Sequence, residues 1–157
     1  MTRPTTSRMA AVWMAAAALT LAACLGGDVE TKSEKDVNTE VQQHADGVAA
    51  VAHQALQNPS LLSRGCTGRA GEISKSVFTV QGVYNLPAPT SETHLELISR
   101  VRADWTSKGY EITDDRTVDT DRGVLAAKTP DGYKLDIETG EPSGFAVFVD
   151  SPCFERP

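Results

Sequence analysis

An apolar run near the N-terminus ends at a cysteine, and this feature decides how much of the chain can fold as a domain. Residues 10–23 contain one polar residue, Thr20, and the nine residues before them carry Arg3 and Arg8 but no acid. A basic segment followed by a short apolar segment is typical of a secretory signal peptide. As a helix the run would be about 21 Å long, shorter than the roughly 30 Å hydrocarbon core of a bilayer. We therefore expect an export signal and not a permanent transmembrane helix.

The residues at the end of this run carry a second signal. Leu21-Ala22-Ala23-Cys24 resembles the lipobox of bacterial lipoproteins. The resemblance implies that residues 1–23 are a lipoprotein signal peptide and that a diacylglyceryl group is attached to Cys24. Two acyl chains are enough for stable membrane attachment, so we expect the protein at the outer face of the cell membrane. The alternative is an ordinary secreted protein in which Cys24 is free or paired.

The next segment is too polar to fold by itself. Gly26–Asp36 contains Val29 as its one large apolar residue, which predicts a flexible tether. We assign residues 24–37 to the lipidated N-terminus and tether, and residues 38–157 to a single globular domain.

Charge limits the partners of this domain. Without residues 1–23, the chain has 134 residues with 13 cations and 21 acids, a net charge of −8. Such an acidic surface argues against nucleic acid as a partner, and against electrostatic adhesion to anionic lipid. The expected contact with the membrane is therefore the lipid anchor.

Apolar spacing predicts a first helix over residues 38–57. Thr39 and Gln42 fit a capping box at its start, and Asn58-Pro59 would end it. The apolar stripe recurs every three or four residues, as a helix requires: Val41, Ala45, Val48, Ala52, Ala55 and Leu56.

A second helix is predicted between Pro89-Thr90-Ser91, which would supply its start, and Gly109, which would close it. Four residues on one face of this helix are expected in the core: Leu95, Ile98, Val101 and Trp105.

The remaining patterns are those of strands. Alternating or β-branched segments predict about five of them: 77–84, 110–117, 123–129, 133–139 and 145–149. Short connections favour an antiparallel meander for the last four. Because 145–149 is apolar at every position, it is expected to be a central strand or one covered on both faces. Lys134, Asp136 and Glu138 alternate with apolar residues and are expected in water. The predicted class is α+β, a mainly antiparallel sheet with two helices packed on one face.

The two remaining cysteines fit an exported protein. Cys66 and Cys153 lie in expected loops at opposite ends of the domain and make an even pair in an oxidising compartment. We expect a disulfide, worth roughly 4.5 kcal/mol by its loop length. Two unpaired structural thiols are the alternative. Cys66 could also act as a nucleophile, although a bridge is the more common role.

Other candidate chemistry is sparse. His44 and His53 would lie on opposite faces of the first helix and could not share a metal ion. Both, with His94, are expected to be surface side chains. Ser143, in Glu141-Pro142-Ser143-Gly144, belongs to a turn and not to a nucleophile elbow. We therefore predict no catalytic residues, no metal site and no cofactor.

One acidic stretch has some features of a calcium loop. Asp119 and Asp121 alternate as calcium ligands do, but the next such position is Gly123 and no closing glutamate follows. Arg116 and Arg122 also neutralise part of the charge. A solvated hairpin tip is the expected interpretation.

Together, the lipobox, the tether and three further segments resemble the small uncharacterised lipoproteins of high-GC Gram-positive bacteria. The segments are 103–110 (ADWTSKGY), 128–133 (KTPDGY) and 151–153 (SPC). The resemblance implies no particular activity. From the anchor, the tether and the half-solvated sheet we expect a non-catalytic binding or interaction module for an unknown protein or small molecule. The alternatives are a cell-envelope enzyme whose site is assembled from distant segments, and a structural or immunity-type surface protein.

Overall fold

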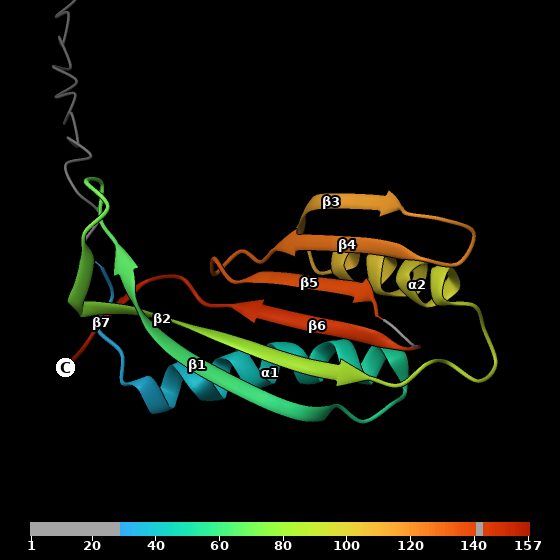
Figure 1. Ribbon diagram of the computed structural model, residues 1–157, viewed down its shortest axis with the longest axis horizontal. Helices are drawn as coiled ribbons and strands as arrows, with labels where there is room; N and C mark the ends of the chain where they lie inside the picture. The colour runs from blue at the N-terminus through green and yellow to red at the C-terminus, as the bar shows by residue number, and fades with distance from the viewer. Residues whose placement is uncertain (1–28, 141–142) are drawn as a thin grey trace, which may run out of the picture.

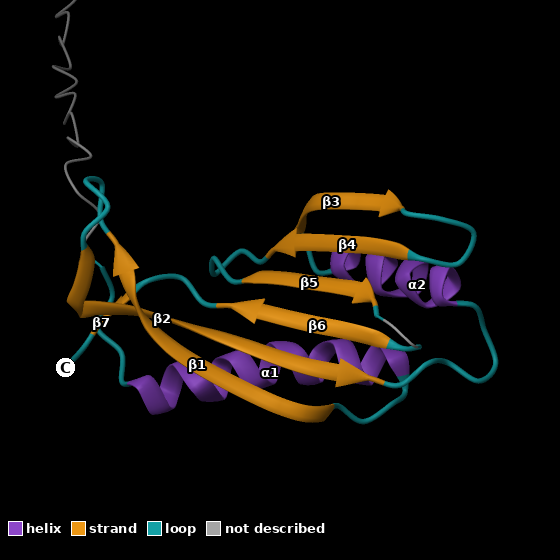
Figure 2. Ribbon diagram, in the orientation of Figure 1, coloured by secondary structure: helices purple, strands orange, loops and turns teal. Residues whose placement is uncertain are grey.

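The computed structural model describes residues 29–140 and 143–157, which form an α+β fold (Figures 1 and 2). The elements in chain order are α1 (Glu34–Ala52), β1 (Gln57–Thr67), β2 (Ile73–Leu86), α2 (His94–Ser107), β3 (Glu111–Thr117), β4 (Gly123–Lys128), β5 (Lys134–Thr139), β6 (Phe145–Asp150) and β7 (Phe154–Glu155). The predicted signal peptide, the lipobox and Cys24 lie outside the described residues. Among those described, no helix is long and apolar enough to cross a membrane.

The sheet is antiparallel throughout and has the strand order β1-β2-β6-β5-β4-β3, with β7 paired to β2. The predicted α+β class, the antiparallel sheet and the meander β3 to β6 are confirmed, and β6 lies inside the sheet. The prediction of about five strands was wrong, since the sheet has seven. The missed strands are β1 and β7. β1 is exposed over most of its length, so no alternation of apolar residues marks it.

Helix α1 begins and ends earlier than the sequence suggested. Its N-cap is Ser33, whose hydroxyl accepts a hydrogen bond from the amide of Asp36 at 3.2 Å. Thr39 is inside the helix, and its hydroxyl donates to the carbonyl of Lys35. The helix stops at His53, which has a left-handed conformation with φ of 55°. The earlier start brings Val37 into the core, where it is fully buried.

The last part of the predicted tether belongs to the fold. The amide of Lys32 donates to the carbonyl of Glu155, and the amide of Glu155 donates to the carbonyl of Glu30. These bonds make Thr31 a parallel bridge partner of Glu155. Backbone pairing of this kind needs no apolar side chains, so the polar composition of the segment did not reveal it.

Helix α2 is closed at both ends by local hydrogen bonds. Thr93 and Glu96 form a capping box, in which each side chain accepts a hydrogen bond from the backbone amide of the other residue. The cap is therefore Thr93 and not the segment 89–91. Gly109 follows the helix with φ of 74°, a conformation that favours glycine. Of the predicted core positions, Ile98, Val101 and Trp105 are buried; Leu95 is partly buried and Leu97 joins the core.

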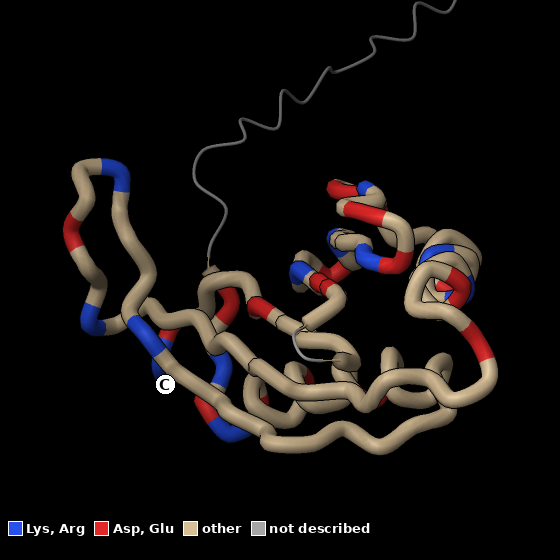
Figure 3. Tube along the Cα trace, turned by 45° about the vertical axis from the view of Figure 1, so that its right-hand side comes forward, with Lys and Arg blue, Asp and Glu red and all other residues tan. Residues whose placement is uncertain are grey.

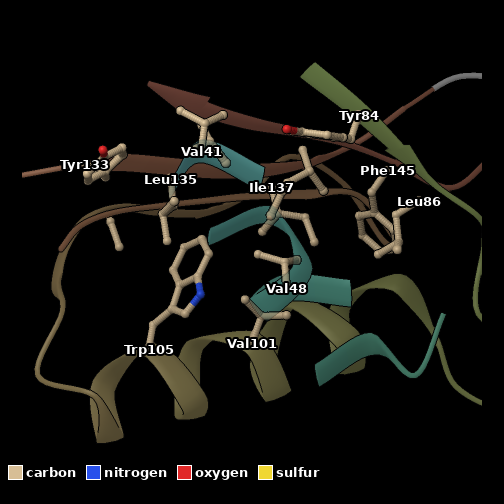
Figure 4. Close-up of a cluster of buried hydrophobic side chains, with 14 of the residues drawn as sticks. Val41, Val48, Tyr84, Leu86, Val101, Trp105, Tyr133, Leu135, Ile137 and Phe145 are labelled. Carbon is tan, nitrogen blue, oxygen red and sulfur yellow. The ribbon is translucent and has the colours of Figure 1, made fainter. Parts of the chain in front are cut away.

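One face of the sheet supplies the core. Residues opposite each other on four neighbouring strands are buried, in the row Tyr84, Val147, Ile137 and Leu125. Figure 4 shows side chains from both helices among them, including Val48 of α1 and Trp105 of α2. At Gly82 the approach of α1 is so close that a Cβ would lie 2.5 Å from a methyl of Val41. Only glycine fits at that point of β2.

The predicted disulfide is confirmed. Cys66 and Cys153 are bonded, with 6.3 Å between their Cα atoms. Cys66 lies within β1 and not in a loop as expected. The bond therefore attaches the outermost strand of the sheet to the segment that precedes β7.

Candidate functional site

The second face of the sheet carries a half-buried carboxylate, Asp136. Pairing across five strands places it in a row with Val83 of β2, Phe148 of β6, Ala126 of β4 and Asp114 of β3. These residues alternate along their strands with the core residues, so they point away from the core. We call this surface the Asp136 face, after its central residue.

Asp136 has one carboxylate oxygen without a donor. Its Oδ1 is buried and has no hydrogen-bond partner among the residues that the structure describes. Burial raises the pKa of Asp136 to about 6, and the nearby carboxylates of Glu138 and Asp114 act in the same direction. Arg116 acts against them, but it is bonded to Asp114 at 2.8 Å. Among the described residues, the site therefore holds a carboxylate with one buried oxygen, Oδ1, that no cation or hydrogen-bond donor contacts.

A pocket of about 380 Å³ opens beside this carboxylate. It lies over β3 to β6 and is lined by Thr113, Ala126, Ala127, Lys128, Lys134, Leu135, Asp136 and Asp150. Lys128 and Lys134 are directly opposite each other on β4 and β5. Neither lysine forms an ion pair with another residue in the described ranges. The pocket thus combines the Asp136 carboxylate, two adjacent cations and an apolar wall with a second acid, Asp150, which lies opposite Lys134 and is bonded to Gln81 and Arg64.

A second polar group of residues lies where α1, the turn between β4 and β5, and β7 meet. We call it the Tyr133 cluster: Lys32, Glu40, His44, Asp131 and Tyr133, which line a pocket of about 380 Å³. The hydroxyl of Tyr133 donates to Glu40 Oε2, and Lys32 Nζ lies 2.9 Å from Glu40 Oε1. The ring of His44 lies against that of Tyr133 with 4.4 Å between centroids and a tilt of 38°, and its Nε2 lies 3.4 Å from Asp131 Oδ2.

The groups of the Tyr133 cluster stabilise one another. Burial alone would raise the pKa of Glu40, but hydrogen bonds from Tyr133 and Lys32 outweigh burial and hold that pKa below its usual range. Burial, followed by the bond to Glu40, raises the pKa of Tyr133 far above its ordinary value. The side-chain bond to Glu40 raises the pKa of Lys32. Each charged form therefore already has its partner within the cluster.

The three histidines do not share one environment. His53 is exposed as predicted, but the prediction was wrong for His44 and His94, which are half-buried. His94 Nδ1 lies 2.6 Å from Asp121 Oδ2 and its ring meets Phe145 edge-on. The sequence could not reveal these partners because each lies far along the chain.

The acidic stretch 114–123 covers the end of β3, the connection 118–122 and the first residue of β4, so it forms the tip of a hairpin as predicted. Its acids are tied to protein groups. Asp121 accepts a bond from the backbone amide of His94 at the start of α2, and Asp119 Oδ2 accepts one from Arg122 Nε. Within residues 29–140 and 143–157, no group of three His, Cys, Asp or Glu side chains could hold a metal ion. In the predicted turn 141–144, Glu141 and Pro142 lie outside the described residues.

The sequence placed Asp136 on the correct face but not in the correct environment. It was expected in water, whereas the structure surrounds it with residues of other strands. The available signal was Phe148, an aromatic residue at the outward-facing parity of β6. An aromatic side chain directly opposite a carboxylate shields it from solvent.

Comparisons with known proteins identified no relative: no protein-family model, no curated protein and no solved structure significantly matches the chain.

Proposed function

We propose that this protein is a non-catalytic binding module held at the outer face of the cell membrane by lipid on Cys24. In this proposal both helices cover the core face of the sheet, and the Asp136 face is open to bind a ligand. The arrangement of the core supports it, because one cluster of buried residues includes side chains of α1, of α2 and of the core face.

The observation that carries the proposal is the unpaired Oδ1 of Asp136. A buried acceptor without a donor lowers stability by about 1–3 kcal/mol, and more when it is charged. A ligand that brings a protonated amine to this oxygen removes the penalty, so part of the binding free energy comes from relief of an unfavourable group. The nearby carboxylates Glu138 and Asp114 favour a cation at the same point.

The neighbouring lysines specify the other end of the ligand. Each lysine also has an acid opposite it on its other neighbouring strand, Glu111 for Lys128 and Asp150 for Lys134, which balances part of the positive charge. An anionic group between Lys128 and Lys134 would contact both ammonium groups and offset the repulsion that remains between them. The volume of about 380 Å³ suits a small molecule. The favoured ligand is therefore a small zwitterion, with an amine for Asp136 and an acidic group for the lysine pair.

The Tyr133 cluster favours a binding protein over an enzyme. Its carboxylates, phenol and imidazole are groups that also occur in catalytic sites. Tyr133, however, is buried, and its hydroxyl donates a hydrogen bond to Glu40. A phenol with a raised pKa is a poor proton donor, and a carboxylate with a lowered pKa is a poor proton acceptor. The cluster is better explained as the joint between α1 and the sheet.

The binding proposal is tested by following the Cγ resonance of Asp136 by NMR while small probes are added. The probes are aminohexanoate and glycine as zwitterions, butylamine as the cation alone and butyrate as the anion alone. We expect a zwitterion to bind most tightly and to lower the pKa of Asp136 from about 6. Asp136→Asn should weaken that binding roughly tenfold or more.

Glu138→Gln is the matched control, because Glu138 is on the same strand and face but does not line the pocket. It should leave binding within a factor of about two, since it acts only through longer-range charge. No response to either zwitterion, or equal responses in the Asp136→Asn variant, would overturn the assignment of this site.

Localisation is tested separately through Cys24. Cys24→Ala should move the protein from the membrane to the soluble fraction, because the apolar run is too short to anchor it. A variant that remains as firmly attached as the original would contradict lipid anchoring and leave the Asp136 result unaffected.

A further inference from the structure

Among the residues that the structure describes, no strand pairs with the outer edge of β1, the outermost strand of the sheet. β1 pairs with β2 on one side only, and this pairing is regular from Ser60 to Gly65. Leu61 and Leu62 lie on opposite faces of the strand and are 42% and 57% exposed. A free edge with exposed apolar residues is a template for pairing with another strand.

The edge at the other side of the sheet is protected. β3 carries four charged side chains in seven residues and a bulge between Ile112 and Asp114. Arg102 of α2 is bonded to Asp115 of β3, so the helix also reaches this edge. Charges and bulges are the usual means by which proteins prevent pairing at an edge strand. β1 also has register shifts, but they lie at its two ends, between Gln57 and Ser60 and between Gly65 and Thr67. From Ser60 to Gly65 the pairing is regular and Arg64 is the one charged residue.

The charges beside β1 are compatible with a second copy of the chain. The whole sequence has a net charge of −6, but β1 contains no acid. Arg64 is 3.4 Å from Asp150 of its own chain, and Arg156, which contacts Ser63, is 2.8 Å from Glu34. Figure 3 shows β1 largely free of charge along its length, whereas acidic and basic residues gather around β3.

We propose that β1 pairs antiparallel with β1 of a second copy, about a twofold axis at Leu62, to form one continuous sheet. Only a twofold axis perpendicular to the sheet makes two identical edge strands antiparallel, and it puts the same face of both copies on the same side. With the axis at Leu62, this residue lies opposite its own copy. Leu61 then lies opposite Ser63, and Ser60 opposite Arg64, so no like charges are opposed.

The pairing involves about five residues per strand and is therefore weak in solution. Attachment to a membrane, as proposed above, would raise the local concentration and the dimer fraction. The pairing itself does not depend on the ligand site or on the anchor. It is separable from both by experiment.

Because Leu62 would lie opposite Leu62 of the second copy, a charge introduced at this position tests the pairing. In the part of the chain that the structure describes, the core and the disulfide lie within residues 37–157, so a chain that begins at residue 25 retains every described helix and strand. By sedimentation equilibrium up to about 1 mM, we expect this chain to show a growing dimer fraction. Leu62→Lys and Leu62→Glu should each weaken dimerisation at least tenfold, because like charges then meet at the axis. A mixture of the two variants should restore it.

Val118→Lys is the control, because Val118 is 55% exposed in the connection after β3 and far from β1 in the sheet order. It should dimerise as the original chain does, and circular dichroism should be the same for all variants. A chain that is monomeric at 1 mM, or variants that dimerise alone as well as the original, would overturn the proposal. Failure of the mixture to restore dimers would overturn the axis at Leu62.

The full-length chain in membranes gives an independent measurement. Leu62→Cys should form an intermolecular disulfide on mild oxidation, because the axis places the two introduced thiols side by side. Val118→Cys should not. Equal crosslinking of both variants would indicate random collision and contradict the proposed pairing.

Discussion

The Tyr133 cluster and the Asp136 face each contain a partly buried carboxylate, but the two carboxylates differ in their hydrogen-bond partners. Glu40 accepts hydrogen bonds from the Tyr133 hydroxyl and the Lys32 ammonium group, and these bonds lower the pKa of Glu40. Asp136 has an oxygen with no donor among the described residues, and its pKa is raised to about 6. Both carboxylates belong to residues that are partly shielded from solvent, so the difference comes from their partners and not from burial alone.

The difference indicates that one carboxylate stabilises the fold and the other is available to bind a ligand. A carboxylate whose partners are supplied by the protein stabilises the native state, whereas one whose partner is missing can gain it from a ligand. The two sites should therefore respond to mutation with opposite signs.

The largest expected effect is at the centre of the Tyr133 cluster. Glu40→Ala removes the acceptor of the buried Tyr133 hydroxyl and the partner of Lys32, so we expect it to lower the free energy of unfolding by about 2–3 kcal/mol. Denaturant unfolding at pH 7 measures this. Glu30→Ala, an exposed acid of the same pocket, should change it by less than about 0.5 kcal/mol. Equal effects would show that the half-buried Glu40 contributes no more to stability than the exposed Glu30, which is also close to Lys32.

Removing the donor should have a smaller effect of the same sign. Tyr133→Phe leaves Glu40 with Lys32 as its remaining partner, and we expect a loss of about 1–2 kcal/mol in thermal or denaturant unfolding. Tyr110→Phe is the matched control, since Tyr110 is only partly buried. A Tyr133→Phe variant as stable as the original would show that the cluster is not a structural joint.

Asp136→Asn should stabilise the protein. Because the folded-state pKa of about 6 lies above the ordinary value of 3.8, the ionised carboxylate destabilises the fold above pH 6 and this penalty disappears as the pH falls toward 4. After allowance for solvent screening of a half-buried group, the gain at pH 7.5 should be about 1 kcal/mol. Unfolding curves of both chains between pH 4 and 7.5 should converge at the acidic end. A variant that is less stable at pH 7.5 would contradict the raised pKa.

The smallest effect is expected at the rim of the Tyr133 cluster. Asp131 lies 3.4 Å from His44 and is largely exposed, so Asp131→Asn should change the free energy of unfolding by no more than about 0.5 kcal/mol. Denaturant unfolding of Asp131→Asn and Glu40→Ala, measured side by side, would show which acids of the Tyr133 cluster stabilise the fold as interior groups and which behave as surface groups. A loss of 2 kcal/mol would place Asp131 among the interior groups.

The sequence predicted well the parts of the fold whose apolar pattern is local. In β5, Leu135 and Ile137 alternate with polar residues, and Gly109 follows α2 in the conformation that only glycine favours. β1 was missed because an edge strand exposed on both faces has no such pattern. The N-cap at Ser33 was missed because the polar residues around it suggested a tether, although Val37 is the first residue of the buried stripe.

The candidate site was less predictable because it depends on pairing across strands. Nothing near Asp136 in the sequence shows that Phe148 lies opposite it or that Lys128 faces Lys134. These neighbours follow from the strand order and the register, and two strands of that order were not foreseen. The cysteine pair could be predicted without the register because only two cysteines remained after Cys24.

The bridge between Thr31 and Glu155 has a mechanical consequence for a chain held at its N-terminus. A pull on the chain ahead of residue 30 first loads the two hydrogen bonds to Glu155, before it reaches the cap of α1 at Ser33. Glu155 is two residues from Cys153, whose bond to Cys66 passes force covalently to the far strand of the sheet. The hydrogen bonds between residues 30–32 and Glu155 thus pass part of the tension to the sheet, and they protect α1 from unfolding from its N-terminal end.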